Sequence, residues 1–339
     1  MASIDEVARE AGVSITTVSH VFSEKRPVAP ETRRRVVAAA ERLRYQPHRA
    51  ARGLATGRTM TIGLHFPFEV DSLMLNPYFP MMLEGLSAAA AEAGYGFLLI
   101  PASLEAKFPL KLALKERRFD GVIVADPTDD GTLIPMLLER RVPLVTAGRY
   151  LKSDDVPWVD NDHRRSIAQL MAHLEEQGYE RPALISEKSA ISYRQDLEES
   201  FEREVRERGG EVSIVRGDHF SDEHGFLLAL RLLSQPRPPD AIVAATDRLA
   251  IGVLRAAHEL RLRVPRDLGV AGVDDTMLAR RSHPRLTSIR LWPHRLGAAA
   301  VELLIAIVER SVVPENRRLP AELVPRASTR RRRRRPSRS

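Results

Sequence analysis

The 339-residue chain contains no cysteine. This absence excludes disulfide bonds, thiol nucleophiles and cysteine-ligated metals, and it suits a reducing compartment such as the cytoplasm. No apolar run reaches the length of about 18 residues that a membrane-spanning helix requires. The first residues, MASIDEVAREAG, carry acidic side chains where a signal peptide needs a basic and then an apolar segment. We therefore expect a cytoplasmic protein with no membrane span.

The sequence also lacks the common signatures of enzymes. No GxGxxG motif follows an expected strand, no phosphate-binding P-loop is present, and no nucleophile can be paired with a base. His163, His173 and His258 lie singly on expected helices, where we interpret them as core or surface residues. The sequence thus predicts neither catalysis nor a metal ion or other cofactor.

Positive charge is concentrated at the two ends of the chain. Residues 1–58 hold 11 Lys and Arg against 6 Asp and Glu, and residues 326–339 hold 8 Arg and no acid. Because the whole chain has a net charge of +7, residues 59–325 carry a net charge of −6. An acidic body with basic ends favours a polyanionic partner for the ends rather than for the whole protein.

The carboxy-terminal segment 326–339 is a charge run, so we expect it to be disordered. Its arginines, Arg330–Arg335, allow two interpretations. They could contact DNA or RNA without sequence specificity and in a salt-dependent way, or they could form a solvated, inert tail. No leucine heptad is present, so a tetramerising coiled coil is not supported.

Short β-branched runs alternate with helical patterns from residue 59 to about 291. Strands that are apolar at nearly every position are covered on both faces, and their alternation with helices predicts parallel α/β layers. About nine strands are many for one such sheet, so we expect two Rossmann-like subdomains joined by crossovers near residues 160 and 290. A cleft between two such sheets is the expected ligand site. The expected strands are 61–66, 95–100, 120–125, 143–147, 182–186, 211–215, 240–245, 268–273 and 287–291.

The amino-terminal stretch EVAREAGVSITTVSHVF has a different pattern. It predicts a helix over Ile4–Ala11, a turn at Gly12–Val13 and a second helix that ends at Phe22, with Ser14 as its cap. Ala8 lies where two helices would cross, and Gly12 can adopt the positive φ that a tight turn needs. The combination is typical of a helix-turn-helix. The side chains expected to point inward are Val7, Ala11, Val13, Val18 and Val21.

The outward face of the second helix is rich in hydroxyl groups. Hydroxyls on a helix can simply be solvated, but the helix-turn-helix pattern, the arginines at 33–35 and a basic link favour contact with DNA. Short donors and acceptors can read base edges in the major groove, and an apolar side chain such as Ile15 suits a thymine methyl. The candidate DNA-binding residues here are Ser14, Ile15, Thr16, Thr17, Ser19 and His20.

The stretches SIDEVAREAGVSITTVSHVF and VAPETRRRVVAAAERLRYQPHRAARGLATGRT resemble the DNA-binding headpiece and hinge of the LacI/GalR family of bacterial transcription regulators. The similarity continues through TIGLHFP, NPYF, RRFDGVIV, VDND, RPPDAIVAATDRLAIGVLRAAHELRLRVPRDLGVAGVDD and PRLTSIRLWP. The resemblance implies an all-α helix-turn-helix headpiece followed by a bilobed α/β core of two Rossmann-like parallel-sheet subdomains. The implied divisions are a headpiece at 1–46, a hinge at 47–58, a core at 59–325 (N-subdomain 59–160 and 291–325, C-subdomain 161–290) and a tail at 326–339.

The resemblance also assigns roles in the headpiece and hinge. A third helix, Thr32–Leu43, is expected to pack against the first two through Val36, Val37, Ala40 and Leu43. Ala29 departs from the family's usual serine or threonine cap, which costs about 0.5–2 kcal/mol. In the hinge, Leu54 matches the side chain that parts a base step in the minor groove, while Arg49 and Arg52 would meet phosphates or the groove floor. Gly53 makes this hinge helix less stable by about 0.5–1 kcal/mol relative to alanine.

In the core, the resemblance implies an effector pocket between the subdomains. Asp160 and Asn161 match a turn between the subdomains. The clearest departure is Leu197, with Ser200, where the family often has an arginine and a glycine; Arg194 and Arg149 are the cationic alternatives. The effectors of other family members therefore do not predict the effector of this protein. The candidate effector-binding residues are Tyr78, Phe79, Arg149, Arg194, Phe220, Asp247 and Asp274.

These features predict a homodimeric transcriptional repressor that binds a near-palindromic operator in double-stranded DNA. A small effector, which could be a sugar, a sugar derivative or a nucleobase-like molecule, would act allosterically from the cleft. The sequence leaves open whether the effector weakens or strengthens DNA binding. Two rivals are weaker: a solute-binding protein has no use for residues 1–58, and a Rossmann enzyme lacks its motifs.

Overall fold

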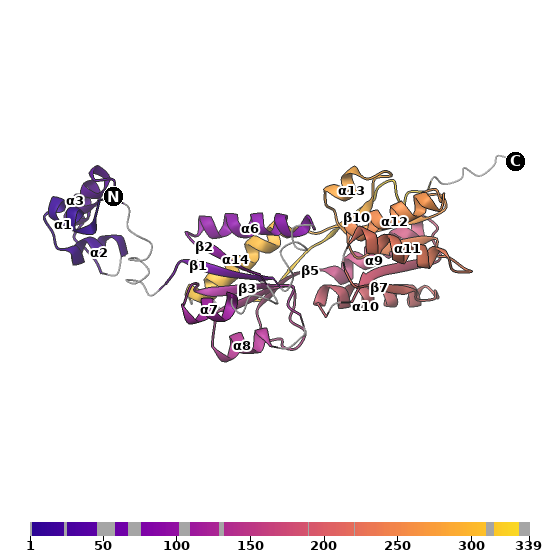
Figure 1. The fold of residues 1–339 in the computed structure, drawn as a ribbon, viewed down its shortest axis with the longest axis horizontal. Helices are drawn as coiled ribbons and strands as arrows, with labels where there is room; N and C mark the ends of the chain where they lie inside the picture. Colours follow the sequence, from indigo (N-terminus) through magenta and orange to yellow (C-terminus); the bar gives the residue numbers. More distant parts are fainter. Residues whose placement is uncertain are drawn as a thin grey trace.

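The structure is a computed structural model (Figure 1). It describes residues 2–23, 26–45, 58–66, 76–101, 109–128, 132–188, 190–219, 221–309 and 315–331. The expected hinge residues Arg49, Arg52, Gly53 and Leu54 and the pocket residue Phe220 lie outside these ranges. Within them, no helix is both long and apolar enough to cross a membrane.

Three helices, α1 (Ile4–Ala11), α2 (Ile15–Ser23) and α3 (Pro30–Arg42), form the amino-terminal unit. Ser3 and Glu6 make a reciprocal capping box at the start of α1, and Gly12 ends that helix with φ 62°. The Ser14 hydroxyl accepts a hydrogen bond from the Thr17 N–H at 3.1 Å, so it caps α2 as expected. The three helices share one apolar cluster of Val7, Ala8, Ala11, Val18, Val21, Val36, Ala39 and Ala40.

Helix α3 corrects one expected core position. Val37 is 37% exposed, because the buried face of α3 follows the helical spacing of Val36, Ala39 and Ala40. Ala29 is the N-cap without a side-chain hydrogen bond, as the sequence indicated. Arg35 points back to α1, where its guanidinium donates to the carbonyl oxygens of Ala11 and Gly12. This contact satisfies free carbonyls at the end of α1 and ties the turn to α3.

The first lobe of the core is a six-stranded sheet in the order β11-β5-β4-β3-β1-β2, and every pairing in it is parallel. Its strands are β1 (Thr61–Phe66), β2 (Gly96–Pro101), β3 (Gly121–Ala125), β4 (Leu144–Ala147), β5 (Trp158–Asn161) and β11 (Arg317–Leu319). Helices α6 (Tyr78–Glu92) and α14 (Pro293–Glu309) pack on one face of the sheet. Helices α7 (Pro109–Lys115) and α8 (Leu133–Glu139) cover the other face.

The second lobe is another six-stranded sheet, in the order β12-β10-β9-β8-β6-β7. Only the β10–β12 pair is antiparallel. Its strands are β6 (Pro182–Glu187), β7 (Ile214–Gly217), β8 (Ala241–Ala244), β9 (Gly269–Asp274), β10 (Thr287–Arg290) and β12 (Glu322–Val324). Its helices are α9 (His163–Glu176), α10 (Ser192–Glu207), α11 (Asp222–Leu233), α12 (Asp247–Glu259) and α13 (Met277–Arg281).

Helices α11 and α12 cross at unusually close range. A Cβ atom built on Gly252 would lie 2.0 Å from the carbonyl oxygen of Asp222, and one on Gly225 would lie 2.2 Å from that of Leu249. Only glycine permits this approach of two backbones. The crossing joins α11, which packs on β6 and β7, to α12, which packs on β8 and β9, and the first turns of both helices carry site residues (Figure 1).

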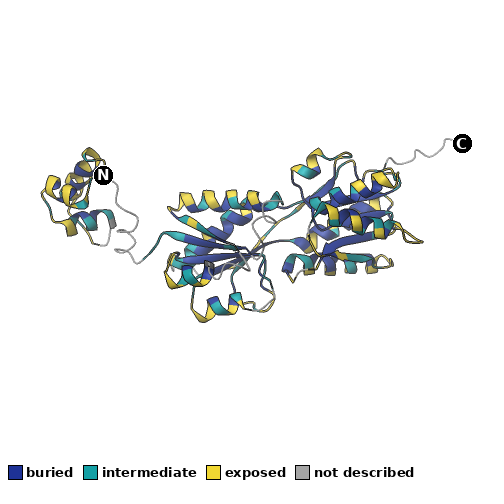
Figure 2. Cartoon of the chain, in the orientation of Figure 1, coloured by how far each residue is buried: buried dark blue, intermediate teal, exposed yellow. Residues whose placement is uncertain are grey.

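Burial follows this layered arrangement. In Figure 2 the central strands of both sheets are buried and the edge strands less so, while the helices are buried on one side and exposed on the other. Strands β3, β4, β8 and β9 are buried at every position, which is the expected result for parallel strands with helices on both faces. All nine strands expected from the sequence are present within a few residues. The pattern missed β5, β11 and β12, which have only three or four residues each.

The end of the chain corrects the expected domain boundaries. The chain crosses between lobes a third time after β11, so that β12 joins the second sheet rather than the first lobe. Ser328 and Thr329 are fully buried, although we expected disorder from residue 326 onward. The Ser328 hydroxyl accepts from the Thr287 N–H at 2.8 Å and contacts the Val270 carbonyl oxygen at 2.5 Å. Two short polar residues beside the sheet leave no apolar periodicity for a sequence pattern to detect.

We predict that two truncations will differ in stability. A chain that ends at Arg331 should keep the melting temperature of the full chain. A chain that ends at Pro325 should be less stable by about 1–3 kcal/mol for each buried polar group that it leaves unsatisfied, including the Val270 carbonyl. Urea unfolding followed by circular dichroism measures the stability of both truncations. Equal midpoints for the two truncations would contradict the ordered role of residues 326–329.

Candidate functional site

A cavity of about 410 Å³ lies between the two lobes. The carboxyl ends of seven strands, three from the first lobe and four from the second, supply most of its polar lining, and the remainder comes from helices and the crossovers. The volume is within the range of small-molecule sites. The described residues that line it are Asn76, Tyr78, Phe79, Met82, Ala125, Asp126, Ala147, Gly148, Asp160, Asn161, His163, Glu187, Ile191, Tyr193, Asp218, His219, Ser221, His224, Thr246, Arg248, Asp274, Leu291 and Leu296.

Two aspartates that line the cavity, one at a strand end in each lobe, have an unusual backbone conformation. Asp126 follows β3 with φ 43°, and Asp274 ends β9 with φ 110°. Non-glycine residues adopt such positive φ values at a cost in free energy, and they concentrate at functional sites. The first aspartate belongs to the first lobe and the second to the second lobe, so the cavity has an acidic group on each side.

Three carboxyl groups of the cavity are hard to ionise. Burial raises the pKa of Asp126 to about 7, with Asp160 adding to the shift and His163 opposing it. Burial also raises the pKa of Asp274 well above its ordinary value, and the neighbouring charges of Asp247 and Asp126 add to the effect. The pKa of Glu187 rises to about 7, again chiefly through burial. Groups with such shifts in a cleft are candidates for function.

Aromatic rings form the apolar walls. Tyr78 and Phe79 stand edge to face with 5.6 Å between ring centroids, and the rings of His163 and Tyr193 are 4.7 Å apart. Tyr193 donates its hydroxyl proton to the Ala245 carbonyl oxygen, which holds the ring in place. Burial raises the pKa of both tyrosines well above 10, so their hydroxyls stay protonated.

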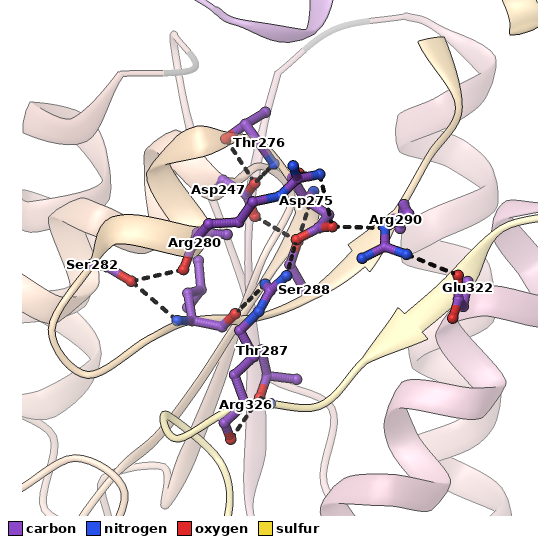
Figure 3. Close-up of polar contacts among 12 residues, drawn as sticks. Asp247, Asp275, Thr276, Arg280, Ser282, Thr287, Ser288, Arg290, Glu322 and Arg326 are labelled. Atoms are coloured by element: carbon purple, nitrogen blue, oxygen red, sulfur yellow. Dashed lines mark hydrogen bonds and ion pairs between the residues drawn. The ribbon is translucent and has the colours of Figure 1, made fainter. Parts of the chain in front are cut away.

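The seven expected effector residues occupy different places. Tyr78, Phe79 and Asp274 line the cavity, whereas Phe220 lies outside the described residues. Asp247 does not line it. One of its oxygens accepts from the N–H and hydroxyl of Thr276, and the other accepts from the Ser288 hydroxyl at 2.6 Å (Figure 3). The structure therefore gives Asp247 a structural role: it links the start of α12 to Thr276 and to Ser288 of β10, while Thr246 caps α12.

The two arginines that were expected as cationic alternatives are engaged with the protein. Arg149, which follows β4 in the first lobe, binds Asp196 on α10 of the second lobe at 2.6 Å and lies 3.7 Å from Asp160. It is thus a clasp between lobes. Arg194 binds Glu198 one helical turn away at 2.8 Å. Neither side chain lines the cavity, and Leu197 is fully packed in the core of the second lobe.

Asp275, the neighbour of Asp274, is completely buried and collects three guanidinium groups. Its carboxylate binds Arg290 at 2.7 Å and Arg280 at 3.2 Å, and it also contacts Arg326 (Figure 3). Arg290 is the last residue of β10, just before the chain crosses to the first lobe, and it reaches Glu322 of β12 at 3.2 Å. The cavity-facing end of β9 is therefore fixed to segments that connect the lobes.

Sequence reasoning missed several cavity residues. His163, expected in the core or on the surface, is indeed buried, but it lines the cavity and lies 3.2 Å from Asp160. Asp126 and Glu187 were also missed, although both follow expected strands and the carboxyl ends of parallel strands form ligand sites. That positional rule could have found them. His173 and His258 match the expectation, since the former is buried against Thr329 and the latter is exposed.

The outward face of α2 is partly as expected. Ile15 is 46% exposed and Thr16 is exposed. Thr17 and Ser19 are half-buried, and the Thr17 hydroxyl lies 2.9 Å from that of Ser14. His20 is half-buried with its Nδ1 shielded from solvent. The side chains most free to reach a partner from this face are thus Ile15 and Thr16.

Two protein-family models match the chain. Residues 3–48 match the model described as bacterial regulatory proteins, lacI family, and residues 171–329 match the periplasmic binding protein-like domain. Catabolite control protein A of Priestia megaterium is 30% identical over 92% of this chain and 94% of that protein. The transcriptional repressor PurR of Serratia proteamaculans is 33% identical over 90% of each.

Solved structures give the same result for the fold. The lac repressor dimer bound to operator and the anti-inducer ONPF superposes with a TM-score of 0.81 at 26% identity, covering 97% of this chain and 99% of that one. The transcriptional regulator CelR in complex with cellobiose has a TM-score of 0.76 at 28% identity, covering 97% and 100%. A helix-turn-helix unit joined to a bilobed core defines a DNA-binding transcription regulator. The chain belongs to the lacI family of bacterial regulatory proteins.

We predict that Asp126→Asn stabilises the unliganded protein in a pH-dependent way. The folded-state pKa of Asp126 is about 7, above the value of about 4 in an unfolded chain. The native protein therefore loses stability relative to the variant as pH rises from about 4 to 7, and the difference stays constant above 7. We expect a gain of about 1–3 kcal/mol at about pH 8 by urea unfolding. The exposed Asp154→Asn is the control, and an equal gain there would contradict the assignment.

Proposed function

We propose that this protein is a cytoplasmic transcriptional repressor that binds a near-palindromic operator. A small molecule in the interlobe cavity would lower or raise its affinity for that operator. The observation that carries the proposal is the combination of a helix-turn-helix with an exposed α2 face and a cavity built from strand ends of both lobes. The compartment follows from the proposed partner, because a repressor must reach chromosomal DNA.

We propose that α2 is the recognition helix. Its exposed Ile15 and Thr16 offer an apolar tip and a short hydroxyl for base edges, while Ser14, Thr17, Ser19 and His20 are assigned to nearby phosphates or to support of the helix. In the hinge, Arg49, Arg52 and Leu54 are proposed to enter the minor groove. A solute-binding protein would have no use for these parts, which separates this proposal from its closest rival.

A homodimer fits this arrangement. Two copies related by a two-fold axis present the same helix twice, which matches an operator with two similar half-sites. The relatives named above include a lac repressor dimer bound to operator. We propose the same assembly for this chain, with the first lobes and hinges moving together when the angle between the lobes changes.

The cavity is proposed to control that angle through Asp274, Tyr78 and Phe79. A ligand that contacts Asp274 acts on the residue next to Asp275. The carboxylate of Asp275 binds Arg290 and Arg326, which flank the crossover segments, and Arg280 of α13. A ligand can shift the equilibrium between lobe arrangements only by its difference in affinity for them. A ligand that contacts residues of both lobes would have such a difference in affinity, because its contacts change when the angle between the lobes changes.

Operator binding should depend on the α2 face. In a gel-shift titration on DNA upstream of the gene and its neighbours, we expect the full chain to give specific retardation at moderate salt. Thr16→Ala and Ile15→Ala should each weaken specific binding by about 1–3 kcal/mol, because each removes a contact to a base edge. Glu41→Gln, on the exposed side of α3, is the control. Absence of any specific retardation, with or without cell metabolites, would refute the proposed function.

Effector response should depend on Asp274. We expect Asp274→Ala and the near-isosteric Asp274→Asn to abolish the change in operator binding that an active metabolite causes in the unaltered chain. Binding to the operator without metabolite checks that each variant is folded. The metabolite is found by thermal shift, since a ligand at 100 times its dissociation constant adds about 2.7 kcal/mol to stability. Unchanged affinity for it in both variants would remove Asp274 from the site.

A further inference from the structure

The cavity is rich in acidic groups and poor in cationic ones. Among its described lining residues, Arg248 is the only guanidinium group, and it lies 3.5 Å from Asp222. The nearby Arg149 and Arg194 are committed to Asp196 and Glu198 and do not line the cavity. The carboxyl groups that do line it are Asp126, Asp160, Glu187, Asp218 and Asp274.

Three of these carboxyl groups lie on opposite sides of the gap, Asp126 in the first lobe and Glu187 and Asp274 in the second. The other two have partners in the protein, since Asp218 pairs with Lys188 and Asp160 with His163. The charge of Asp126, in the first lobe, raises the pKa of both Asp274 and Glu187, in the second lobe. Like charges repel most strongly when they approach in a buried site, so closing the lobes without a ligand is unfavourable while these groups are ionised. A positive charge between them would turn the repulsion into attraction.

Two buried acceptor atoms in the cavity also have no hydrogen-bond partner. The Oδ1 atom of Asn161, a residue 3% exposed, is one, and the Oε1 atom of Glu187, a residue 5% exposed, is the other. Leaving such atoms unpaired costs free energy, which a ligand with N–H or O–H groups would recover. Both atoms accept hydrogen bonds, so the complementary ligand is rich in donors.

The walls suit the same chemistry. The rings of Tyr78, Phe79 and Tyr193 line the cavity beside the carboxyl groups. Aromatic faces attract cations, and the attraction is larger where water is excluded. Acidic groups combined with aromatic rings form a site for an organic ammonium group that is attached to a compact ring or apolar body.

We propose that the effector of this protein is a small, donor-rich ammonium compound whose positive nitrogen lies between Asp126 of the first lobe and Asp274 and Glu187 of the second. This inference rests on the proposed function, because it names the ligand class of the same cavity. Anionic ligands such as sugar phosphates and carboxylates are excluded by the same groups. The buried Leu197, at the position where related regulators often carry an arginine, is consistent with that exclusion.

The test compares matched ligands that differ in charge. One set is glucosamine, glucose, N-acetylglucosamine and glucose 6-phosphate, and a second is tyramine, 4-hydroxyphenylethanol and 4-hydroxyphenylacetate. Calorimetric titration of the full chain measures each affinity. In at least one set we expect the ammonium member to bind about tenfold or more tighter than its neutral partners, which corresponds to about 1.4 kcal/mol, and the anion not to bind.

Variants of the carboxyl groups assign the charge preference to the cavity. Asp126→Asn and Glu187→Gln should each reduce the preference for the ammonium member, while Asp154→Asn, at an exposed site, should leave it unchanged. The inference is overturned if neutral or anionic members bind as tightly as the ammonium members, or if no ammonium member binds at millimolar concentration. Operator retardation by the same preparation keeps the two questions separate. If retardation is intact and the ligand order is wrong, only this inference fails, whereas loss of retardation refutes the proposed function.

Discussion

The direction of the strands is the constraint on which the rest of this structure depends. In both lobes the parallel strands end toward one cavity, so whatever residue follows a strand is brought to the ligand site. Residues that are far apart in the sequence, such as Asp126, Glu187 and Asp274, therefore come together. The burial that stabilises the sheets also removes water from these carboxyl groups, and it is the main cause of their raised pKa values.

A second consequence is that the ligand site and the connections between the lobes share residues. Asp274 faces the cavity, while Asp275 is buried and holds Arg290 and Arg326, which flank the crossing segments (Figure 3). A buried carboxylate that lost one of these partners would be left with uncompensated charge, so the cluster acts as a rigid unit. The end of β9 is thus joined to the start of one crossover by the ion pair of Asp275 with Arg290.

Much of the fold was accessible from the sequence because its signals are local. Continuous apolar runs predicted nine strands, and Ala8, Gly12 and Ser14 predicted the turn between α1 and α2, which the structure confirms. The strands β11 and β12 were not accessible, since a strand of three residues is too short to show a periodic pattern and derives its stability from pairing with a sheet that the sequence does not display. The same holds for Ser328, whose hydrogen bonds reach residues some 40 and 60 positions away.

The place of the cavity could be predicted from the sequence, but the role of each residue in it could not. Resemblance pointed to Tyr78, Phe79 and Asp274, which do line it, but it could not show that Asp247 is used up by Thr276 and Ser288. Nor could it show that Arg149 clasps Asp196 across the lobes instead of facing a ligand. Such commitments depend on which partner lies within about 3 Å, and only three-dimensional packing decides that.

The charges between the lobes act in opposite directions, and their balance bears on the proposed response to a ligand. The pair of Arg149 and Asp196 draws the lobes together outside the cavity, while Asp126 and Asp274 repel each other inside it when both are ionised. If attraction alone were present, the lobes would stay closed with or without a ligand. If repulsion alone were present, a ligand would have to supply all the free energy of closure. With both present, attraction and repulsion offset each other, and a ligand that alters either one alters their balance.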